Sequence, residues 1–344
     1  MRKYLPRLLG NESTKARIGS AIERGELPHA FLIAGQAGSG KLTLATEIAA
    51  ALNCEMRGDR SAPLPCGSCN TCKRIYSGNF TDIKLLEKPK DRATIGVDPI
   101  KDIREDMFLS ATESDHKIYI VRDAETMTPE AQNALLKVLE EPPTSVTVLL
   151  LASEGDKILT TIKSRTQHIA MARFDEKSIE EYLLSKSEDA RIMHREAPEK
   201  FKAIIMSADG RIGEAEKLMS KKLGEACEEE RGSVINIVRS LGRGSGTQNL
   251  LSALSELPQK RTELLRILEL LINALRDVIT SKHSGEARLL FFTSHSDAMA
   301  RADEIGTAAA LWAYDAVCRA HEYCSKNANT QNLISYLAAN IKPI

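Results

Sequence analysis

A glycine-rich segment between a short apolar run and a helix-like run constrains the fold of this chain most strongly. The apolar run "FLIA" covers residues 31–34, "GQAGSGKLT" follows at residues 35–43, and "KLTLATEIAAALNC" continues with helical periodicity. A strand, a glycine turn and a helix in this order form a loop whose backbone N–H groups can surround a phosphate. The sequence therefore predicts a phosphate-binding loop inside an α/β domain.

This loop departs from its pattern at one position. Gly35, Gly40 and Lys41 fit, but Leu42 replaces the hydroxyl residue that normally contacts Mg²⁺. Thr43 brings a hydroxyl one residue later, rotated by about 100° around the helix, so we expect it to face elsewhere. ATP binding is thus left open, and hydrolysis is not expected. The residues of this vestigial or weak nucleotide loop are Gly35, Gly38, Gly40, Lys41 and Thr43.

The acidic half of a hydrolytic site is also altered. It should follow the apolar strand "KIYIV" at residues 117–121 as an adjacent Asp and Glu, but the chain continues Arg122, Asp123, Ala124, Glu125. An adjacent acidic pair is absent, because Arg122 opens the segment and Ala124 separates the two carboxylates. We therefore interpret this segment as a polar turn between a strand and a helix.

Further strands and helices alternate along the first half of the chain. Strands are predicted at residues 81–87, 117–121 and 146–153, with another short one near residue 168. A helix follows Asp98 as N-cap with Pro99 at its first position, and a second follows Thr128 as N-cap and ends before Pro142. This alternation predicts a doubly wound parallel α/β domain over residues 1–172.

The second half of the chain is predicted to be helical. Short helices with polar turns indicate a small helical domain over residues 173–225, and longer helices indicate an all-α domain over residues 226–344. The segment "ELLRILELLINALRDVI" is apolar around so much of its circumference that we expect it to be buried in a bundle or against other subunits.

Four of the seven cysteines lie close together at residues 54–72. Cys54, Cys66, Cys69 and Cys72 have the spacing C-x11-C-x2-C-x2-C, and four thiolates can close a tetrahedral shell without an open position. This pattern predicts a structural Zn²⁺ site rather than a catalytic one. The other cysteines, at positions 227, 318 and 324, lie in helix-like sequence and are expected to be core residues.

Charge and hydropathy argue against several classes of protein. Lys plus Arg and Asp plus Glu both number 47, whereas a protein that binds DNA alone is expected to show a basic excess. The N-terminus lacks a signal-peptide pattern, and no apolar run reaches the ~18 residues of a membrane span. We expect a cytoplasmic protein.

The motifs, taken in order, resemble those of a known family. The phosphate loop, the cysteine module, "NALLKVLEEPP" at residues 133–143, "LLLAS" at 149–153 and "SRT" at 164–166 are similar to bacterial clamp-loader subunits of the AAA+ class. Both the gamma/tau and the delta-prime subunits of DNA polymerase III show this order. The resemblance implies an AAA+ domain with a zinc knuckle, a small helical lid and a C-terminal helical collar.

The departures from the gamma pattern match the delta-prime pattern. In an ungapped alignment, the metal-binding Asp falls on Arg122, and the sensor arginine of the lid falls on Gly213. The resemblance then implies a subunit with little or no ATPase activity, which supplies Arg165 of "SRT" as an arginine finger to a neighbouring ATPase subunit. Its implied partners are gamma/tau and delta subunits and, through the complex, the sliding clamp and primer-template DNA. Ser153, at the family's first sensor position, is treated as structural.

Two other functions remain as alternatives. An active gamma/tau-type ATPase is opposed by Leu42, Arg122 and Gly213. A zinc-dependent nucleic-acid module that works alone is opposed by zero net charge and by an aromatic content of only 4%.

Overall fold

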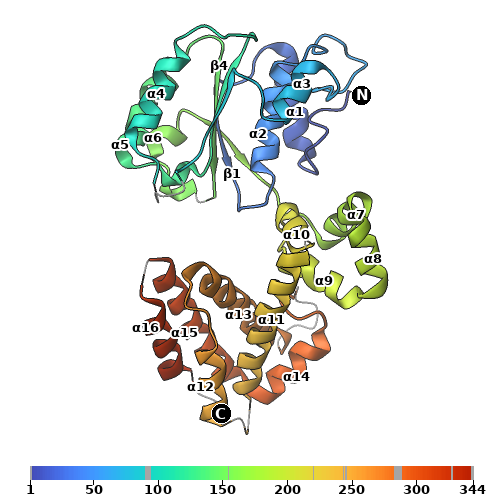
Figure 1. The fold of residues 1–344 in the computed structure, drawn as a ribbon, viewed down its shortest axis with the longest axis vertical. Coiled ribbons are helices and arrows are strands. Elements are labelled where there is room, and N and C mark those ends of the chain that lie inside the picture. The colour runs from blue at the N-terminus through green and yellow to red at the C-terminus, as the bar shows by residue number, and fades with distance from the viewer. Residues whose placement is uncertain are drawn as a thin grey trace. The chain divides into compact units, whose positions relative to one another are not determined.

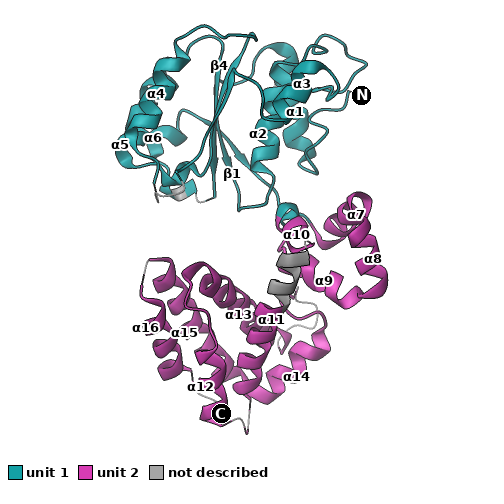
Figure 2. Cartoon of the chain, viewed as in Figure 1, with its two compact units in different colours: residues 1–174, 211–213 teal, residues 175–210, 214–344 magenta. Residues whose placement is uncertain are grey.

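The computed structural model describes residues 2–89, 94–153, 155–219, 221–242, 244, 246–282, 289–326 and 328–341, without the side chains of residues 156 and 221–228. The chain divides into two compact units (Figure 2). Unit 1 comprises residues 1–174 and 211–213, and unit 2 comprises residues 175–210 and 214–344. Each unit has its own hydrophobic core.

Unit 1 is built on a sheet of five parallel strands in the order β2-β3-β4-β1-β5. The strands are β1 (Ala30–Ala34), β2 (Ile83–Leu86), β3 (Lys117–Val121), β4 (Val146–Ala152) and β5 (Gln167–Ala170). β3 and β4 are buried along their whole lengths, because helices cover both faces of a parallel sheet. The predicted parallel α/β domain is confirmed.

Two sets of helices cover the two faces of the sheet (Figure 1). One face carries α1 (Glu12–Arg24), α2 (Lys41–Leu52) and α3 (Asn70–Tyr76), and the other carries α4 (Val97–Met107), α5 (Pro129–Glu140) and α6 (Thr160–Lys163). The side chains of successive β4 residues point to opposite faces of the sheet. Leu149 therefore lies in the core with α2, and Leu150 lies in the core with α5. Short 3-10 turns follow two strands, η1 (Ala124–Thr126) and η2 (Gly155–Lys157).

The two predicted helix starts in unit 1 have different outcomes. Thr128 caps α5 as predicted, because its hydroxyl accepts a hydrogen bond from the N–H of Ala131 at 3.3 Å and Pro129 is the first helical residue. The prediction for Asp98 is wrong: α4 begins one residue earlier, at Val97, with Gly96 as N-cap. Asp98 lies in the first turn instead, where its charge still favours the positive end of the helix dipole.

Unit 2 is entirely helical among its described residues. Its helices are α7 (Glu176–Lys186), α8 (Glu188–Glu196), α9 (Pro198–Ser207), α10 (Ile212–Met219), α11 (Lys221–Ser240), α12 (Thr247–Ser255), α13 (Arg261–Ser281), α14 (His295–Ile305), α15 (Thr307–Ser325) and α16 (Thr330–Asn340), of which α10 begins in the segment that belongs to unit 1. As predicted, α13 is buried on much of its circumference, and it contacts α11, α14 and α15.

The predicted helical character of residues 173–344 is confirmed, but its division at residue 225 stays a prediction. A large hydrophobic cluster extends from Met206 to Ile341, and a smaller one contains Ile204 and Leu218. Among the residues that the structure describes, no helix is both long and apolar enough to cross a membrane.

Candidate functional site

The phosphate loop has the predicted strand-loop-helix context. β1 ends at Ala34 and α2 begins at Lys41, with Gly40 as its N-cap. Gly38 has a φ of 81° and Gly40 a φ of 91°, a region that side-chain-bearing residues rarely adopt. Glycine at these two positions is therefore what allows the tight turn into the helix.

The side chain of Lys41 is directed at this loop. Its Nζ donates to the carbonyl oxygen of Gly35, to that of Gln36 at 3.1 Å, and to the hydroxyl of Ser153 at 3.4 Å. Burial lowers the pKa of Lys41, and the negative charges of Glu125 and Asp123 oppose this shift. The lysine is thus placed where it could bind a phosphate, but here it contacts the loop's own oxygen atoms.

The two residues after Lys41 are both exposed. Leu42, which stands at the usual magnesium-contacting position, is 36% exposed, and Thr43 also lies at the surface. An isobutyl side chain has no oxygen to offer a metal ion. The first departure seen in the sequence therefore removes a ligand at this position.

The segment after β3 forms a polar turn, as the sequence predicts. Asp123 has a φ of 50°, and residues 124–126 form the 3-10 turn η1. Arg122, at the position of the family's metal-binding Asp, instead forms an ion pair with Glu87 at 2.5 Å.

Glu125 makes a contact that sequence reasoning missed. Its Oε1 accepts a hydrogen bond from the backbone N–H of Ser153 at 3.0 Å, whereas its Oε2 is buried without a hydrogen-bond partner. This contact joins the turn after β3 to Ser153 at the end of β4, the same residue whose hydroxyl Lys41 contacts. A carboxylate two residues beyond the expected acidic pair carried no sequence signal for this contact.

Gly213 lies directly against the phosphate loop. Its N–H donates to the carbonyl oxygen of Gly38 at 3.0 Å. A Cβ atom at position 213 would lie 3.1 Å from the Cα of Gly38 and 3.2 Å from its oxygen, so there is little room for any side chain. The glycine that stands at the predicted sensor-arginine position thus permits a close backbone contact.

The four cysteines of the predicted metal site are brought together. All four Sγ atoms of Cys54, Cys66, Cys69 and Cys72 lie within 4.8 Å of one another, and those of Cys66 and Cys72 are 4.0 Å apart. Tetrahedral coordination with metal–sulfur bonds of ~2.3 Å requires sulfur atoms about 3.8 Å apart. This cluster therefore fits a tetrahedral metal ion with only small movements.

Backbone N–H groups support the sulfur atoms of this cluster. The N–H of Cys69 donates to the Sγ of Cys66 at 3.3 Å, and the N–H of Cys72 donates to the Sγ of Cys69 at 3.4 Å. Although burial opposes ionisation of Cys66, hydrogen bonds from Cys69 and Ser68 bring its pKa down to about 6. Burial raises the pKa of Cys54 and of Cys72.

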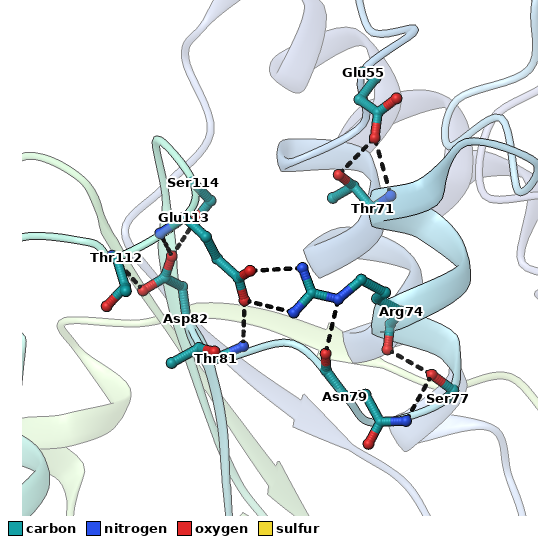
Figure 3. A network of polar contacts seen from close by, with 10 residues as sticks. All are labelled: Glu55, Thr71, Arg74, Ser77, Asn79, Thr81, Asp82, Thr112, Glu113 and Ser114. Atoms are coloured by element: carbon teal, nitrogen blue, oxygen red, sulfur yellow. Dashed lines mark hydrogen bonds and ion pairs between the residues drawn. The ribbon is translucent and has the colours of Figure 1, made fainter.

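A polar network connects the cysteine module to the sheet (Figure 3). Arg74 of α3 donates to both carboxylate oxygens of Glu113, at 2.6 and 3.0 Å, and Glu113 also accepts the N–H of Thr81 at 2.8 Å. Beside it, Asp82 accepts the N–H groups of Thr112 and Glu113, each at 2.8 Å. The helix that carries Cys72 is thereby fixed to the loops at the amino ends of β2 and β3.

The cysteines outside the cluster follow the core prediction only partly. Cys324 is fully buried in the core of unit 2, as expected, but Cys318 is only half-buried. Cys227 lies in α11, and its side chain falls outside the described residues.

Arg165 is exposed and lies between α6 and β5. Its Nη2 forms an ion pair with Oε1 of Glu140 at 2.8 Å, and its Nη1 donates to the carbonyl oxygen of Thr161 at 3.0 Å and to the hydroxyl of Ser164 at 3.4 Å. The contact with Glu140, at the end of α5, was not predicted. The only available signal was that Glu140 belongs to the "NALLKVLEEPP" segment.

Arg165 and the phosphate loop lie at opposite edges of the sheet. Gln167 at the start of β5 lies close to Phe31 near the start of β1, and Ala170 pairs with Ala34 just before the loop. Since both strands are parallel, Arg165 precedes the amino edge while the loop follows the carboxyl edge. The structure therefore does not bring these two predicted sites together.

Sequence comparison relates the chain to DNA polymerase III subunits. The family described as "DNA polymerase III, delta subunit" matches residues 10–175. The delta' subunit of DNA polymerase III from Bacillus subtilis is 28% identical over 324 residues, which cover 92% of this chain and 92% of that protein.

Subunits of the tau and gamma/tau type match over less of their own length. The tau subunit of Bacillus subtilis is 29% identical over 289 residues, and the match covers 80% of this chain but 50% of that protein. A gamma/tau subunit of Mycobacterium tuberculosis is 34% identical over 172 residues, covering 48% of this chain and 29% of the relative. The chain thus spans about half or less of these longer relatives.

Structural comparison finds more distant likenesses. A gamma subunit-related protein from Thermotoga maritima has a TM-score of 0.48 at 18% identity, covering 95% of this chain and 99% of that one. The RuvB branch migration motor of the same organism has a TM-score of 0.42 at 16% identity, covering 83% and 81%. Of the sequence relatives described here, delta' is the one matched along nearly the whole length of both chains, and the chain is thus similar to the delta' subunits of DNA polymerase III.

Proposed function

We propose that this delta-prime-type subunit works in a clamp loader with gamma/tau and delta partners, in the cytoplasm, and helps to load the sliding clamp onto primed DNA. In this role it hydrolyses little or no ATP itself and donates Arg165 to the ATP site of a neighbouring subunit. The similarity to delta' along 92% of both chains and the order of the motifs support the assignment.

The observation that carries the arginine-finger role is the position of Arg165. The side chain is 37% exposed and lies at the edge of the sheet opposite the chain's own phosphate loop. It is thus badly placed for catalysis in cis and accessible to another subunit. An arginine supplied in trans can accelerate phosphoryl transfer by roughly 10³- to 10⁵-fold, because it stabilises the charge of the transition state.

Three departures from the pattern of an ATP-hydrolysing site support the loss of hydrolysis. Leu42 offers no oxygen to Mg²⁺, Arg122 is paired with Glu87, and Gly213 brings no arginine to the phosphates. We interpret the loop as a retained phosphate cradle without hydrolytic use. Steady ATP turnover by the purified chain would instead favour the active gamma/tau-type alternative.

We further propose that the cysteine cluster binds Zn²⁺ as a structural ion. Its four sulfur atoms leave no coordination position for water or substrate, which is the arrangement of structural rather than catalytic zinc. When bound, the ion would fix the segment between α2 and α3.

The test of the proposed function is reconstitution of the clamp loader with gamma/tau-type and delta partners. We expect Arg165→Ala to lower DNA-stimulated ATPase activity and clamp loading by at least ~10³-fold, on the scale of arginine fingers. Arg17→Ala, which removes another exposed arginine from α1, is the matched control and should leave both activities unchanged. Unchanged activity in the Arg165→Ala complex would refute the arginine-finger role.

A further inference from the structure

The segment "NALLKVLEEPP" is distinctive in the sequence, yet the proposed function assigns it no task. The structure connects its first glutamate, Glu140, to the proposed arginine finger, since Oε1 of Glu140 lies 2.8 Å from Nη2 of Arg165. The other terminal nitrogen of Arg165 is also occupied, by the carbonyl oxygen of Thr161 at 3.0 Å and the hydroxyl of Ser164 at 3.4 Å. Both ends of the guanidinium fork are therefore engaged within this chain.

These contacts compete with the proposed use of the arginine. A guanidinium binds carboxylate and phosphate groups through the same planar fork of N–H donors. A phosphoryl group of a neighbouring subunit must therefore replace the carboxylate of Glu140 to gain the same donors. The carboxylate of Glu140 and the phosphoryl group of the neighbouring subunit are thus alternative partners of the Arg165 guanidinium.

The ion pair is weak enough for such an exchange. The side chains of Arg165 and Glu140 are 37% and 48% exposed, and ion pairs between solvent-exposed groups contribute only ~0.2–1 kcal/mol. A phosphoryl group carries more negative charge than one carboxylate and meets the arginine in a less hydrated site, where attraction is stronger. Glu140 can thus hold the guanidinium without preventing its transfer.

The backbone at Arg165 does not depend on this ion pair. The N–H of Arg165 donates to the carbonyl oxygen of Ile162 at 3.0 Å, and the hydroxyl of Thr166 donates to the same oxygen at 3.0 Å. Ile162 itself is fully buried. Removing the carboxylate of Glu140 should therefore release the arginine side chain while the segment keeps its fold.

We propose that Glu140 is a positioning residue that holds Arg165 in a resting conformation and yields it to the phosphoryl group of a neighbouring ATPase site. This inference rests on the proposed function, because it assumes that Arg165 acts in trans. The first glutamate of the "LEEPP" segment, Glu140, would thus control when Arg165 is available to the neighbouring site. The established contacts require only an exchange of partners, with no bond made or broken.

The test uses the reconstituted clamp loader with Glu140→Gln and Glu140→Ala subunits. Because the competing ion pair contributes ~0.2–1 kcal/mol, we expect kcat/KM of the DNA-stimulated ATPase to rise roughly 1.5- to 5-fold at low ionic strength. The gain should shrink as salt screens the pair in the wild type. Glu141→Gln, which removes the adjacent exposed carboxylate, is the matched control and should show no gain.

A double substitution separates this role from a merely structural one. In an Arg165→Ala background, Glu140→Gln should have no further effect on kcat/KM, because the residue acts only through the arginine. Unchanged or lower kcat/KM in the single Glu140 variants, with Arg165→Ala strongly impaired, would overturn the positioning role alone. An unimpaired Arg165→Ala complex would instead overturn the proposed function.

Discussion

The backbone N–H of Gly213 donates a hydrogen bond to the carbonyl oxygen of Gly38 at 3.0 Å, so that residues 211–213 belong to unit 1 although they lie far along the chain. The contact is possible because neither residue has a side chain. Gly38 also has a φ of 81°, a backbone conformation that would be strained in a residue with a side chain. Two glycines from motifs 175 residues apart in sequence thus form one structural feature.

Gly213→Ala is expected to destabilise the protein. The added methyl group would lie 3.1 Å from the Cα of Gly38, and overpacking of this kind costs about 1–3 kcal/mol, which exceeds the gain of about 1 kcal/mol for alanine in a helix. We expect a net loss of about 1 kcal/mol, measured as a fall of about 2–4 °C in the thermal transition by calorimetry.

The control for this substitution is Gly232→Ala in α11. A Cβ atom there would have no neighbour within 4 Å, so helix propensity alone should stabilise the protein by about 0.5–1 kcal/mol. Opposite signs for the two substitutions support the close contact at Gly213. A gain in stability at both positions would contradict it.

Loss of one cysteine ligand is expected to release both metal and structure. Cys69→Ser should abolish stoichiometric zinc, measured by elemental analysis of the purified protein, because one thiolate of the tetrahedral shell is missing. Arg57 lies between the ligands Cys54 and Cys66, in a segment that Arg2 holds through the carbonyl oxygens of Met56 and Arg57. Loss of the metal should loosen this segment, so that trypsin cleaves it more readily at Arg57.

Cys318→Ser serves as the control for the metal prediction. This residue is half-buried in α15 of unit 2 and is not one of the four clustered cysteines, so the zinc content and trypsin pattern of the Cys318→Ser protein should match the wild type. A wild-type chain that is isolated folded and without zinc would refute the proposed ion.

Asp106 predicts a specific dependence of stability on pH. Burial opposes its ionisation, but hydrogen bonds from Lys84, Tyr119 and Lys117 lower its pKa to about 2. Because this value lies below the unfolded pKa of 3.8, the carboxylate stabilises the fold above pH ~4, and this contribution is lost as the pH falls from 4 to 2.

Asp106→Asn should therefore lower the free energy of unfolding at pH 7 by about 1.5–3 kcal/mol, the range for hydrogen bonds to charged groups. Urea denaturation at several pH values should show this difference shrinking below pH 4. The exposed Asp102 of α4 provides the control, and Asp102→Asn should change stability little at any pH. A difference for Asp106→Asn that stays constant down to pH 2 would disprove the pKa assignment.

Trp312 gives a direct probe of the proposed collar. It is the chain's single tryptophan, lies on α15, and is 75% exposed beside Leu311, which is 49% exposed. Buried tryptophans commonly contribute about 2 kcal/mol or more to protein interfaces, so Trp312→Ala should weaken assembly with the partner subunits by roughly 30-fold.

The measurement for Trp312 is the Kd of assembly, with the emission of the wild-type tryptophan shifting to shorter wavelength as the complex forms. In this assay the partners must lack tryptophan or be measured separately. Normal assembly of the Trp312→Ala subunit, together with unchanged emission, would place the interface elsewhere on the chain.

Local sequence determined the elements that depend on near neighbours. The run from Phe31 to Lys41 specified strand, glycine turn and helix, because the required φ values and periodicity lie within a few residues. The four cysteines were equally readable, since three of them lie within seven residues of one another. The strand 117–121 and the cap at Thr128 were also located correctly.

Tertiary structure decided the contacts that no spacing could indicate. The turn of Asp123 into a positive φ, the hydrogen bond from Ser153 to Glu125, and the pairing of Arg165 with Glu140 join segments whose proximity depends on strand order and helix packing. Thus the sequence by itself determined the phosphate loop, the cysteine ligands and the alternation of strands and helices. Which edge of the sheet each charged group reaches was decided only when β5 packed beside β1, because parallel strands separate the residues before them from those after them.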